Sequence, residues 1–125
     1  MKINKDELPV VMEAPGIVMR GLKDWGGMTV GYNQLPGGAD FTPFLEGLDN
    51  DRCHCPHWGY ILEGSIKLVY NDGTEEITKA GDLFYWPSGH TAIVLEDTKL
   101  MDFSPDKEMG ELMANIERKM QEMGG

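Results

Sequence analysis

Tight turns recur through the middle of this 125-residue chain and leave room only for short strands between them. The clearest turn is Asn71-Asp72-Gly73, because all three residue types tolerate the positive φ that a tight hairpin turn needs. Gly81 and the segment Pro87-Ser88-Gly89 mark two further turns. Short strands at a spacing of roughly eight to twelve residues are typical of a sandwich or barrel. The sequence therefore predicts an all-β fold.

The expected strands are runs of β-branched, aromatic and aliphatic residues between the turns. Two of them, at 17–20 and 28–35, precede the central turns, and residues 1–16 show no clear pattern. A short strand at 41–46 is also expected, at a sheet edge because of Pro43. The remaining expected strands are 57–62, 65–70, 74–78, 83–86, 90–95 and 100–103.

The end of the chain changes to a helical period. Ser104 is a favourable N-cap and Pro105 suits the first helical position. We expect a single domain, 1–125, with a barrel core at about 28–103 and a C-terminal α-helix at about 105–123. The apolar face of this helix packs on the barrel or, alternatively, contacts another subunit. The face consists of Met109, Leu112, Met113, Ile116, Met120 and Met123.

Charge and composition narrow the classes of partner. The formal net charge of −10 disfavours binding to nucleic acid and to anionic membranes. No apolar run approaches the roughly 18–20 residues of a membrane span, and the first ten residues lack the apolar core of a signal peptide. We therefore expect a cytoplasmic protein with reduced thiols. Cys53 and Cys55 are poorly spaced for a mutual disulfide, which leaves free thiols or metal ligands.

All three histidines and both cysteines of the chain lie in two short segments of the sequence. Extended backbone in the first segment puts Cys53, Cys55 and His57 on one face. His54 faces the other way, although a bend at Pro56 could rotate the segment and bring His54 into the same site. The second segment ends at His90. Thiolate and imidazole ligands gathered in two places indicate one metal site built where two strands meet.

The chain resembles the cupin superfamily over roughly residues 40–103. The first cupin motif runs Gly, five residues, His-x-His, three or four residues, Glu, six residues, Gly. The second runs Gly, five residues, Pro-x-Gly, two residues, His, three residues, Asn. Gly64 fits the closing glycine of the first motif, and Gly81, Pro87 and Gly89 fit the second in register. The resemblance implies a double-stranded β-helix, the cupin or jelly-roll barrel of two packed antiparallel sheets.

The same resemblance implies a set of metal ligands. His57 occupies the position of the cupin metal-binding glutamate, and Cys53 and Asp51 occupy those of the paired histidines. The histidine position of the second motif lies two residues after His90, on the same strand face. We therefore expect His57 and His90 to share a metal inside the barrel, with Cys53 or Cys55 completing the set.

The mixed set of thiolate and imidazole ligands favours zinc. Iron(II) is the second candidate, and it would need open coordination positions. The alternative is a metal-free barrel in which the same groups form hydrogen bonds. Tyr60, Tyr85 and Trp86 are expected in the core or along a pocket at the barrel mouth, where a small ligand would bind.

Two classes of function stay open. The first is a metal-dependent enzyme that acts on a small organic molecule, as many cupin barrels do. The second is a small-ligand binding or sensor module with a structural or absent metal. Three or fewer protein ligands favour the enzyme, and a closed tetrahedral set favours the structural role. A homodimer is expected because Trp58, Tyr60 and Leu62 lie opposite the interior face, and because cupins are commonly dimeric.

Overall fold

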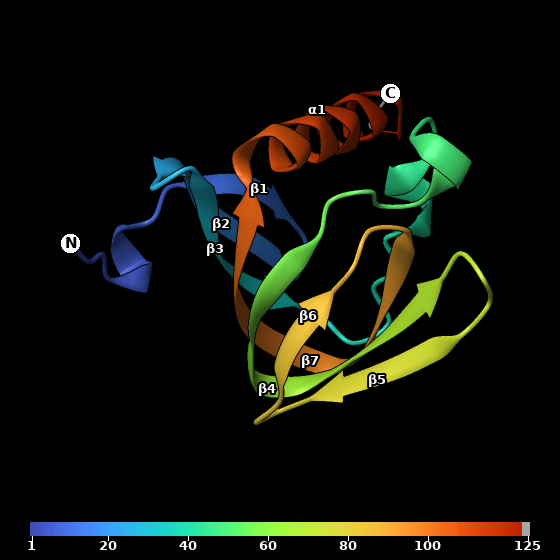
Figure 1. Cartoon of the computed structure of the whole chain (residues 1–125), viewed down its shortest axis with the longest axis horizontal. Helices are drawn as coiled ribbons and strands as arrows, with labels where there is room; N and C mark the ends of the chain where they lie inside the picture. The colour runs from blue at the N-terminus through green and yellow to red at the C-terminus, as the bar shows by residue number, and fades with distance from the viewer. Residues whose placement is uncertain (124–125) are drawn as a thin grey trace.

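In a computed structural model that describes residues 1–123, seven β-strands form the body of the molecule and an α-helix lies across one end (Figure 1). Three short 3₁₀-helices complete it, η1 (Lys5–Glu7), η2 (Thr42–Leu45) and η3 (Asp49–Asp51). The long elements are β1 (Val10–Ala14), β2 (Ile17–Trp25), β3 (Met28–Leu35), β4 (His57–Tyr70), β5 (Glu75–Lys79), β6 (Leu83–Trp86), β7 (His90–Pro105) and α1 (Asp106–Met123).

The strands pair antiparallel in the order β1-β2-β3-β7-β4-β5, and β6 pairs with the start of β4. Both β4 and β7 are long and bend sharply at the end of the barrel away from α1 (Figure 1). Gly64 sits at the bend of β4 with φ 89°, and a Cβ there would overlap the carbonyl oxygen of Asp97. The all-β jelly-roll fold with a C-terminal helix, which the sequence predicted, is confirmed.

The bends join strands that the sequence analysis kept apart. The predicted strands 57–62 and 65–70 are two halves of β4, and 90–95 and 100–103 are parts of β7. The strand expected at 41–46 is wrong, because Thr42–Leu45 forms a 3₁₀-helix with its proline in the first turn. Residues 10–14, which showed no pattern, form β1 at the sheet edge.

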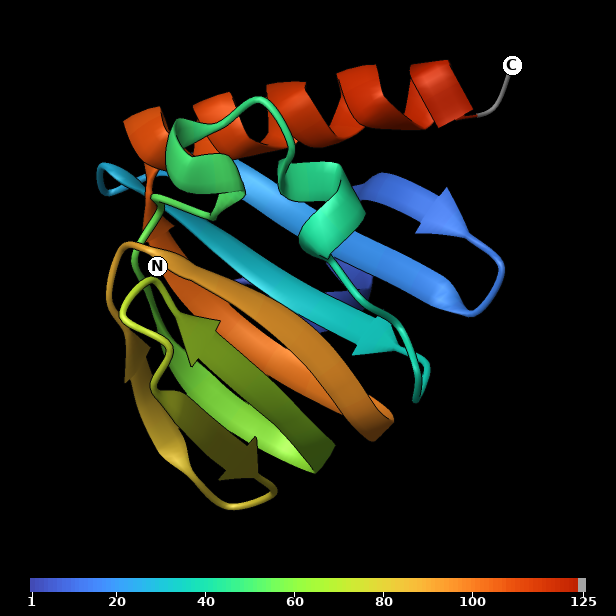
Figure 2. The ribbon, with the colours of Figure 1, turned by 90° about the vertical axis from the view of Figure 1, so that its right-hand side faces the viewer.

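The helix α1 closes the open end of the barrel and crosses over β2 and β3 (Figure 2). Leu112 and Ile116 are buried in the core, while three methionines of the stripe are partly buried against it. Only Met123 of the stripe is largely exposed, so the helix packs on the barrel, the first of the two interpretations. None of the helices within residues 1–123 has the length and apolar character needed to cross a membrane.

Candidate metal centre

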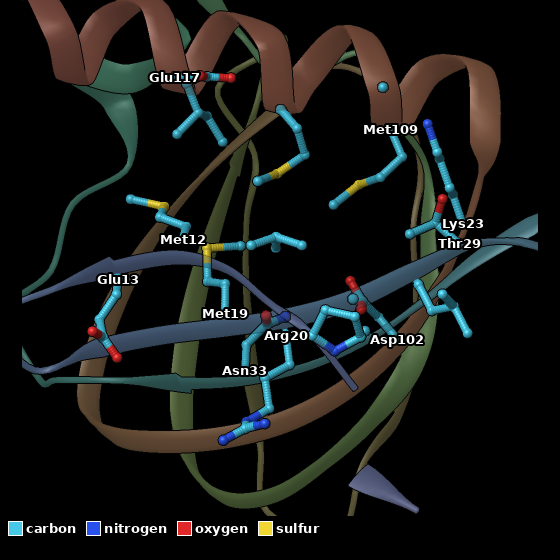
Figure 3. A pocket seen from close by; sticks show the side chains of 18 of the residues that line it. Met12, Glu13, Met19, Arg20, Lys23, Thr29, Asn33, Asp102, Met109 and Glu117 are labelled. Carbon is cyan, nitrogen blue, oxygen red and sulfur yellow. The ribbon is translucent and has the colours of Figure 1, made fainter. Parts of the chain in front are cut away.

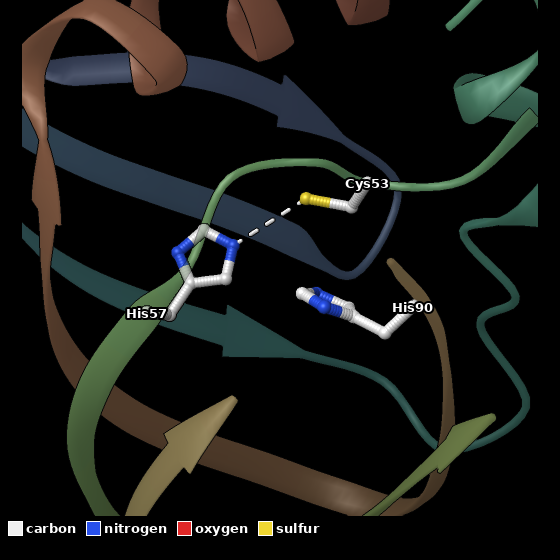
Figure 4. A group of neighbouring side chains, drawn as sticks. All are labelled: Cys53, His57 and His90. Carbon is white, nitrogen blue, oxygen red and sulfur yellow. Dashed lines mark hydrogen bonds between the residues drawn. The ribbon is translucent and has the colours of Figure 1, made fainter. Parts of the chain in front are cut away.

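Three buried side chains meet near the open end of the barrel, on the inner side of its wall (Figure 4). The thiol of Cys53 and ring nitrogens of His57 and His90 all lie within 4.8 Å of one another. Cys53 Sγ is 3.6 Å from His57 Nε2. Atoms bound to one zinc ion at about 2.0–2.3 Å lie roughly 3.3–3.8 Å apart in a tetrahedral site, so this spacing suits a shared ion.

Backbone pairing brings these residues together from distant parts of the chain. The N–H of Cys53 donates to the carbonyl of His90 at 2.7 Å, and the N–H of His90 donates back at 3.2 Å. His57 is the first residue of β4 and pairs with Trp86 of β6. The segment between Cys53 and His57 is a short connection that crosses the barrel mouth, and the strand begins at His57 as the sequence predicted.

Hydrogen bonds orient both imidazoles. His90 Nδ1 lies 2.8 Å from the carbonyl oxygen of Pro87, which can only accept, so Nδ1 carries the proton and Nε2 keeps its lone pair. His57 Nδ1 lies 2.7 Å from Ser104 Oγ and 3.6 Å from Asp102 Oδ2. With its proton on Nδ1, His57 presents the Nε2 lone pair toward Cys53. Partners of this kind typically fix the tautomer of metal-binding histidines.

Burial keeps the two imidazoles and the Cys53 thiol uncharged in the absence of a metal. Burial, and then the proximity of His90, lowers the pKa of His57 to about 3. Burial also lowers the pKa of His90, so both rings are neutral at pH 7 and able to coordinate. The close approach of His57 and Asp102 is consequently no ion pair, because the imidazole is uncharged. Burial raises the pKa of Cys53 to about 12 and that of Asp102 to about 7.

Other candidate ligands lie outside this group. Cys55 is fully buried, but its Sγ lies 3.4 Å from the Pro56 carbonyl oxygen, and burial raises the pKa of its thiol. His54 turns outward, with Nε2 3.0 Å from a carboxylate oxygen of Glu111 on α1. Asp51 is exposed and accepts a hydrogen bond from a loop N–H. The structure thus brings together His57, His90 and Cys53, and leaves Cys55 beside them.

The predicted pocket residues divide between two surfaces. Trp86 is buried and lines a cavity of about 90 Å³ together with the three candidate ligands. Tyr60 and Tyr85 line neither described cavity, because alternation along β4 and β6 turns them to the outer face. There Tyr85 stacks on Trp58, with ring centroids 5.0 Å apart.

Sequence reasoning missed the polar residues behind His57. Ser104 was expected to cap the helix, but it is the buried penultimate residue of β7, and α1 begins only at Asp106. Asp102 is also buried, on the same strand face as Leu100 and Ser104. The available signal was the alternation of apolar and polar residues over Met101, Asp102, Phe103 and Ser104.

No protein-family model matches the sequence, and no curated protein matches it either. Solved structures do match. KdgF from Halomonas sp. superimposes with a TM-score of 0.56 at 21% identity, over 82% of this chain and 90% of that one. An RmlC-like cupin from Shewanella frigidimarina gives 0.57 at 18% identity, over 82% and 88%. Ectoine synthase from P. lautus gives 0.61 at 11% identity, over 85% and 78%. The cupin fold that the two sequence motifs predicted is therefore the fold of this chain.

Proposed function

We propose that this protein is a metal-binding cupin whose divalent ion is held by Cys53, His57 and His90. The convergence of their three ligand atoms within 4.8 Å, in a buried site, carries the proposal. Isolated buried histidines usually satisfy hydrogen bonds in a core. Here each ring uses Nδ1 for that purpose and leaves Nε2 to the shared space, which supports a ligand role.

Three protein ligands leave coordination positions for water or a substrate. That count favours an enzyme acting on a small organic molecule over a closed structural site, which would need a fourth ligand such as Cys55. The soft thiolate and two imidazoles favour zinc, and iron(II) is the second candidate. When bound, such an ion supplies a Lewis acid that polarises a substrate oxygen or activates water.

Metal analysis of purified variants tests this proposal. His57→Ala should lose most of the metal, because removing one ligand of three weakens binding by several kcal/mol. The matched control is His54→Ala, which removes an imidazole three residues away that pairs with Glu111 and should leave the metal content unchanged. Equal metal content in the two variants would contradict the ligand set. Wild-type protein that takes up no zinc, iron, manganese or nickel would remove the metal function altogether.

Cysteine variants separate the two thiols. Cys53→Ser should lower metal affinity strongly, whereas Cys55→Ser should leave it within a few-fold, because Cys55 lies outside the group of three. The alternative function, a small-ligand binding or sensor module, would be favoured if metal binds with all positions closed by protein. Spectroscopy of a cobalt(II)-substituted protein reports this, since a bound water exchanges with added anions.

We also propose that the protein forms a homodimer through the outer face of β4 and β6. Trp58 and Tyr85 stack there in contact with solvent, and Leu83 is 84% exposed. Exposed apolar patches of this kind typically mark interaction surfaces. Light scattering should give about twice the 14.0 kDa mass of one chain, and Leu83→Glu should shift it toward the monomer. A monomeric wild-type protein at micromolar concentration would exclude the dimer.

A further inference from the structure

A cavity of about 860 Å³ lies between α1 and the inner face of β2 and β3, beside the metal centre (Figure 3). Its size falls in the range of roughly 300–1,000 Å³ that is typical of small-molecule sites. The cavity at the metal ligands, about 90 Å³, has room only for an ion and a few water molecules. An organic molecule that reaches the metal must therefore occupy the larger cavity. Both cavities are lined by Met19, Asn33, Asp102, Met109 and Ile116.

Two buried polar side chains stand at the border between the cavities without hydrogen-bond partners. Asp102 and Asn33 are each 7% exposed, and neither side chain forms a hydrogen bond with any residue from 1 to 123. The nearest polar neighbour of the Asp102 carboxylate is His57 Nδ1, at 3.6 Å. Among residues 1–123 the one fully enclosed side-chain polar atom without a partner is Arg52 Nε, so the polar atoms of Asp102 and Asn33 are open to the cavities they line, where a bound molecule can hydrogen-bond to them.

Glycines keep the floor of the cavity open next to Asp102. Gly21 of β2, Gly31 of β3 and Asp102 of β7 stand side by side in the sheet. A Cβ on Gly31 would overlap Asp102 Oδ1, so the carboxylate lies over bare backbone. A Cβ on Gly21 would meet nothing closer than 3.4 Å, although this residue also lines the cavity. Neither glycine therefore places a side chain on the cavity floor beside the carboxylate.

Methionines form most of the apolar wall. Met12, Met19 and Met109 point into the cavity in Figure 3, and two more methionines of α1, at 113 and 120, line it. Methionine is unbranched and polarisable, so it adapts to varied shapes and packs well against aromatic rings. Such a wall suits an apolar body of variable shape better than a polar or sugar-like one.

The charged groups around the cavity disfavour anions. Besides Asp102, three carboxylates, Glu13, Asp106 and Glu117, line the cavity together with two cations, Arg20 and Lys23. Arg20 points away from the cavity in Figure 3, and its Nη1 donates to the carbonyl of Leu8 at 2.9 Å. In the metal-free protein, a carboxylate or phosphate ligand would meet Asp102 without a facing cation at the inner end.

We propose that this cavity binds a small molecule with an apolar, preferably aromatic, body among the methionines and a hydrogen-bond-donating head, a hydroxyl or an ammonium group, at Asp102 and Asn33. The inference rests on the proposed metal function only in treating this molecule as the substrate. Asp102 then receives the donor of the head group, and Asn33 provides a second donor or acceptor beside it. The head group stops at the border of the metal cavity, which is where a metal-bound water would meet it.

Methionine-methyl NMR provides a direct test with internal controls. Metal-free protein labelled with ¹³C at the methyl groups of its nine methionines is titrated with 2-phenylethanol, 2-phenylethylamine and phenylacetate. The alcohol and the amine should bind with a Kd of about 1 mM or tighter, and phenylacetate should bind at least tenfold more weakly. Five resonances, those of the cavity methionines, should shift. The controls are the other four, Met1, Met28, Met101 and Met123.

Substitutions in the cavity test separately where the polar head group and the apolar body of the bound molecule lie. Asp102→Asn should weaken binding of the alcohol about tenfold, because the amide oxygen is an uncharged and weaker acceptor than the carboxylate. Asp49→Asn removes the same charge from a residue that lines neither cavity and should change nothing. Gly21→Val places a β-branched side chain in the open floor and should abolish binding of all three probes. Circular dichroism and the melting temperature verify that each variant is folded.

Metal-free protein distinguishes this proposal from the metal function. Cys53→Ala should lose metal but still bind the alcohol, because Cys53 lines only the smaller cavity. Asp102→Asn should still bind metal but lose the head-group preference. Equal affinity for phenylacetate and the alcohol, shifts spread over all nine methionines, or unchanged binding in Gly21→Val would each overturn the cavity proposal, whatever the metal content.

Discussion

The two ends of the barrel bury side chains of different chemistry, although the same strands, β4 and β7, supply both ends. The closed end, where both strands bend, contains Ile61, Ile66 and Val94, each at most 1% exposed. The open end beneath α1 buries His57 and Asp102 almost as deeply, each 7% exposed. These two sets of side chains are therefore buried to a similar depth, but only the set at the open end can ionise.

This contrast shows how the fold tolerates its candidate site. Apolar burial at the closed end stabilises the barrel by roughly 25 cal/mol for each Å² removed from water. Burial at the open end works against folding, since it disfavours the charged forms of His57 and Asp102 and shifts both pKa values. The closed end stabilises the barrel. The open end positions polar groups that a ligand can hydrogen-bond to or coordinate.

The largest expected effect is at the closed end. Ile61→Ala should lower the free energy of unfolding by about 2–5 kcal/mol, because it leaves a cavity in a fully buried site. Ile77→Ala, at a position that is 59% exposed, should change it by less than about 0.5 kcal/mol. Urea denaturation of metal-free protein measures both. Similar losses for the two variants would break the contrast between the closed end and the surface.

Asp102→Asn should stabilise the metal-free protein at high pH. The carboxyl has a pKa of about 7 when folded, above its usual value, so its contribution is present at low pH and lost as pH rises through 7. The free energy of unfolding of the variant, relative to that of the wild type, should therefore rise by a few kcal/mol between about pH 4 and pH 8. The lowered pKa of His57 destabilises the fold as pH falls, but His57 is present in both proteins. Its effect therefore cancels when their free energies of unfolding are subtracted. A constant difference across pH would contradict the shifted pKa.

A smaller effect is expected from the residue that orients His57. Ser104→Ala removes the hydroxyl 2.7 Å from His57 Nδ1 and should lower metal affinity by about 10–100-fold, without removing a ligand. Competition with a chelator of known affinity measures this loss. Thr98→Val serves as the control, since Thr98 is equally buried but lies at the bend of β7. An unchanged affinity in Ser104→Ala would show that the hydroxyl has no orienting role.

The smallest expected effect is a dependence of metal affinity on pH. Because burial raises the pKa of Cys53 to about 12, its thiol must release a proton when metal binds. Metal affinity should therefore rise about tenfold per pH unit between about pH 8 and pH 9, where both histidines are neutral. Cys53→Asp offers a ligand that is already ionised and should flatten the slope. A wild-type slope near zero would mean that no thiol proton is displaced.

Much of the fold could be predicted from the sequence, because turns and strand patterns are local features of the chain. Asn71-Asp72-Gly73 and the glycines at 64 and 81 set where strands could end, and the cupin spacing placed them in a known order. The same spacing matched Cys53 to a ligand position but left Cys55 as an equal alternative, and alternation put His57 inward and Trp58 outward. Bends were harder, since β4 continues through Gly64 where the sequence suggested a turn.

The sequence by itself determined the position of most strands, the C-terminal helix and the side chains able to bind a metal, because periodicity and turn chemistry act over a few residues. Only the tertiary structure decided which of those side chains meet. The bridge between Cys53 and His90 joins residues 37 positions apart, and the carboxylate of Asp102 lies over Gly31 of another strand. The cavity beneath α1 arises where methionines from three separate elements face two glycines. Such neighbours are fixed by how the sheet bends and closes, and no local pattern encodes that geometry.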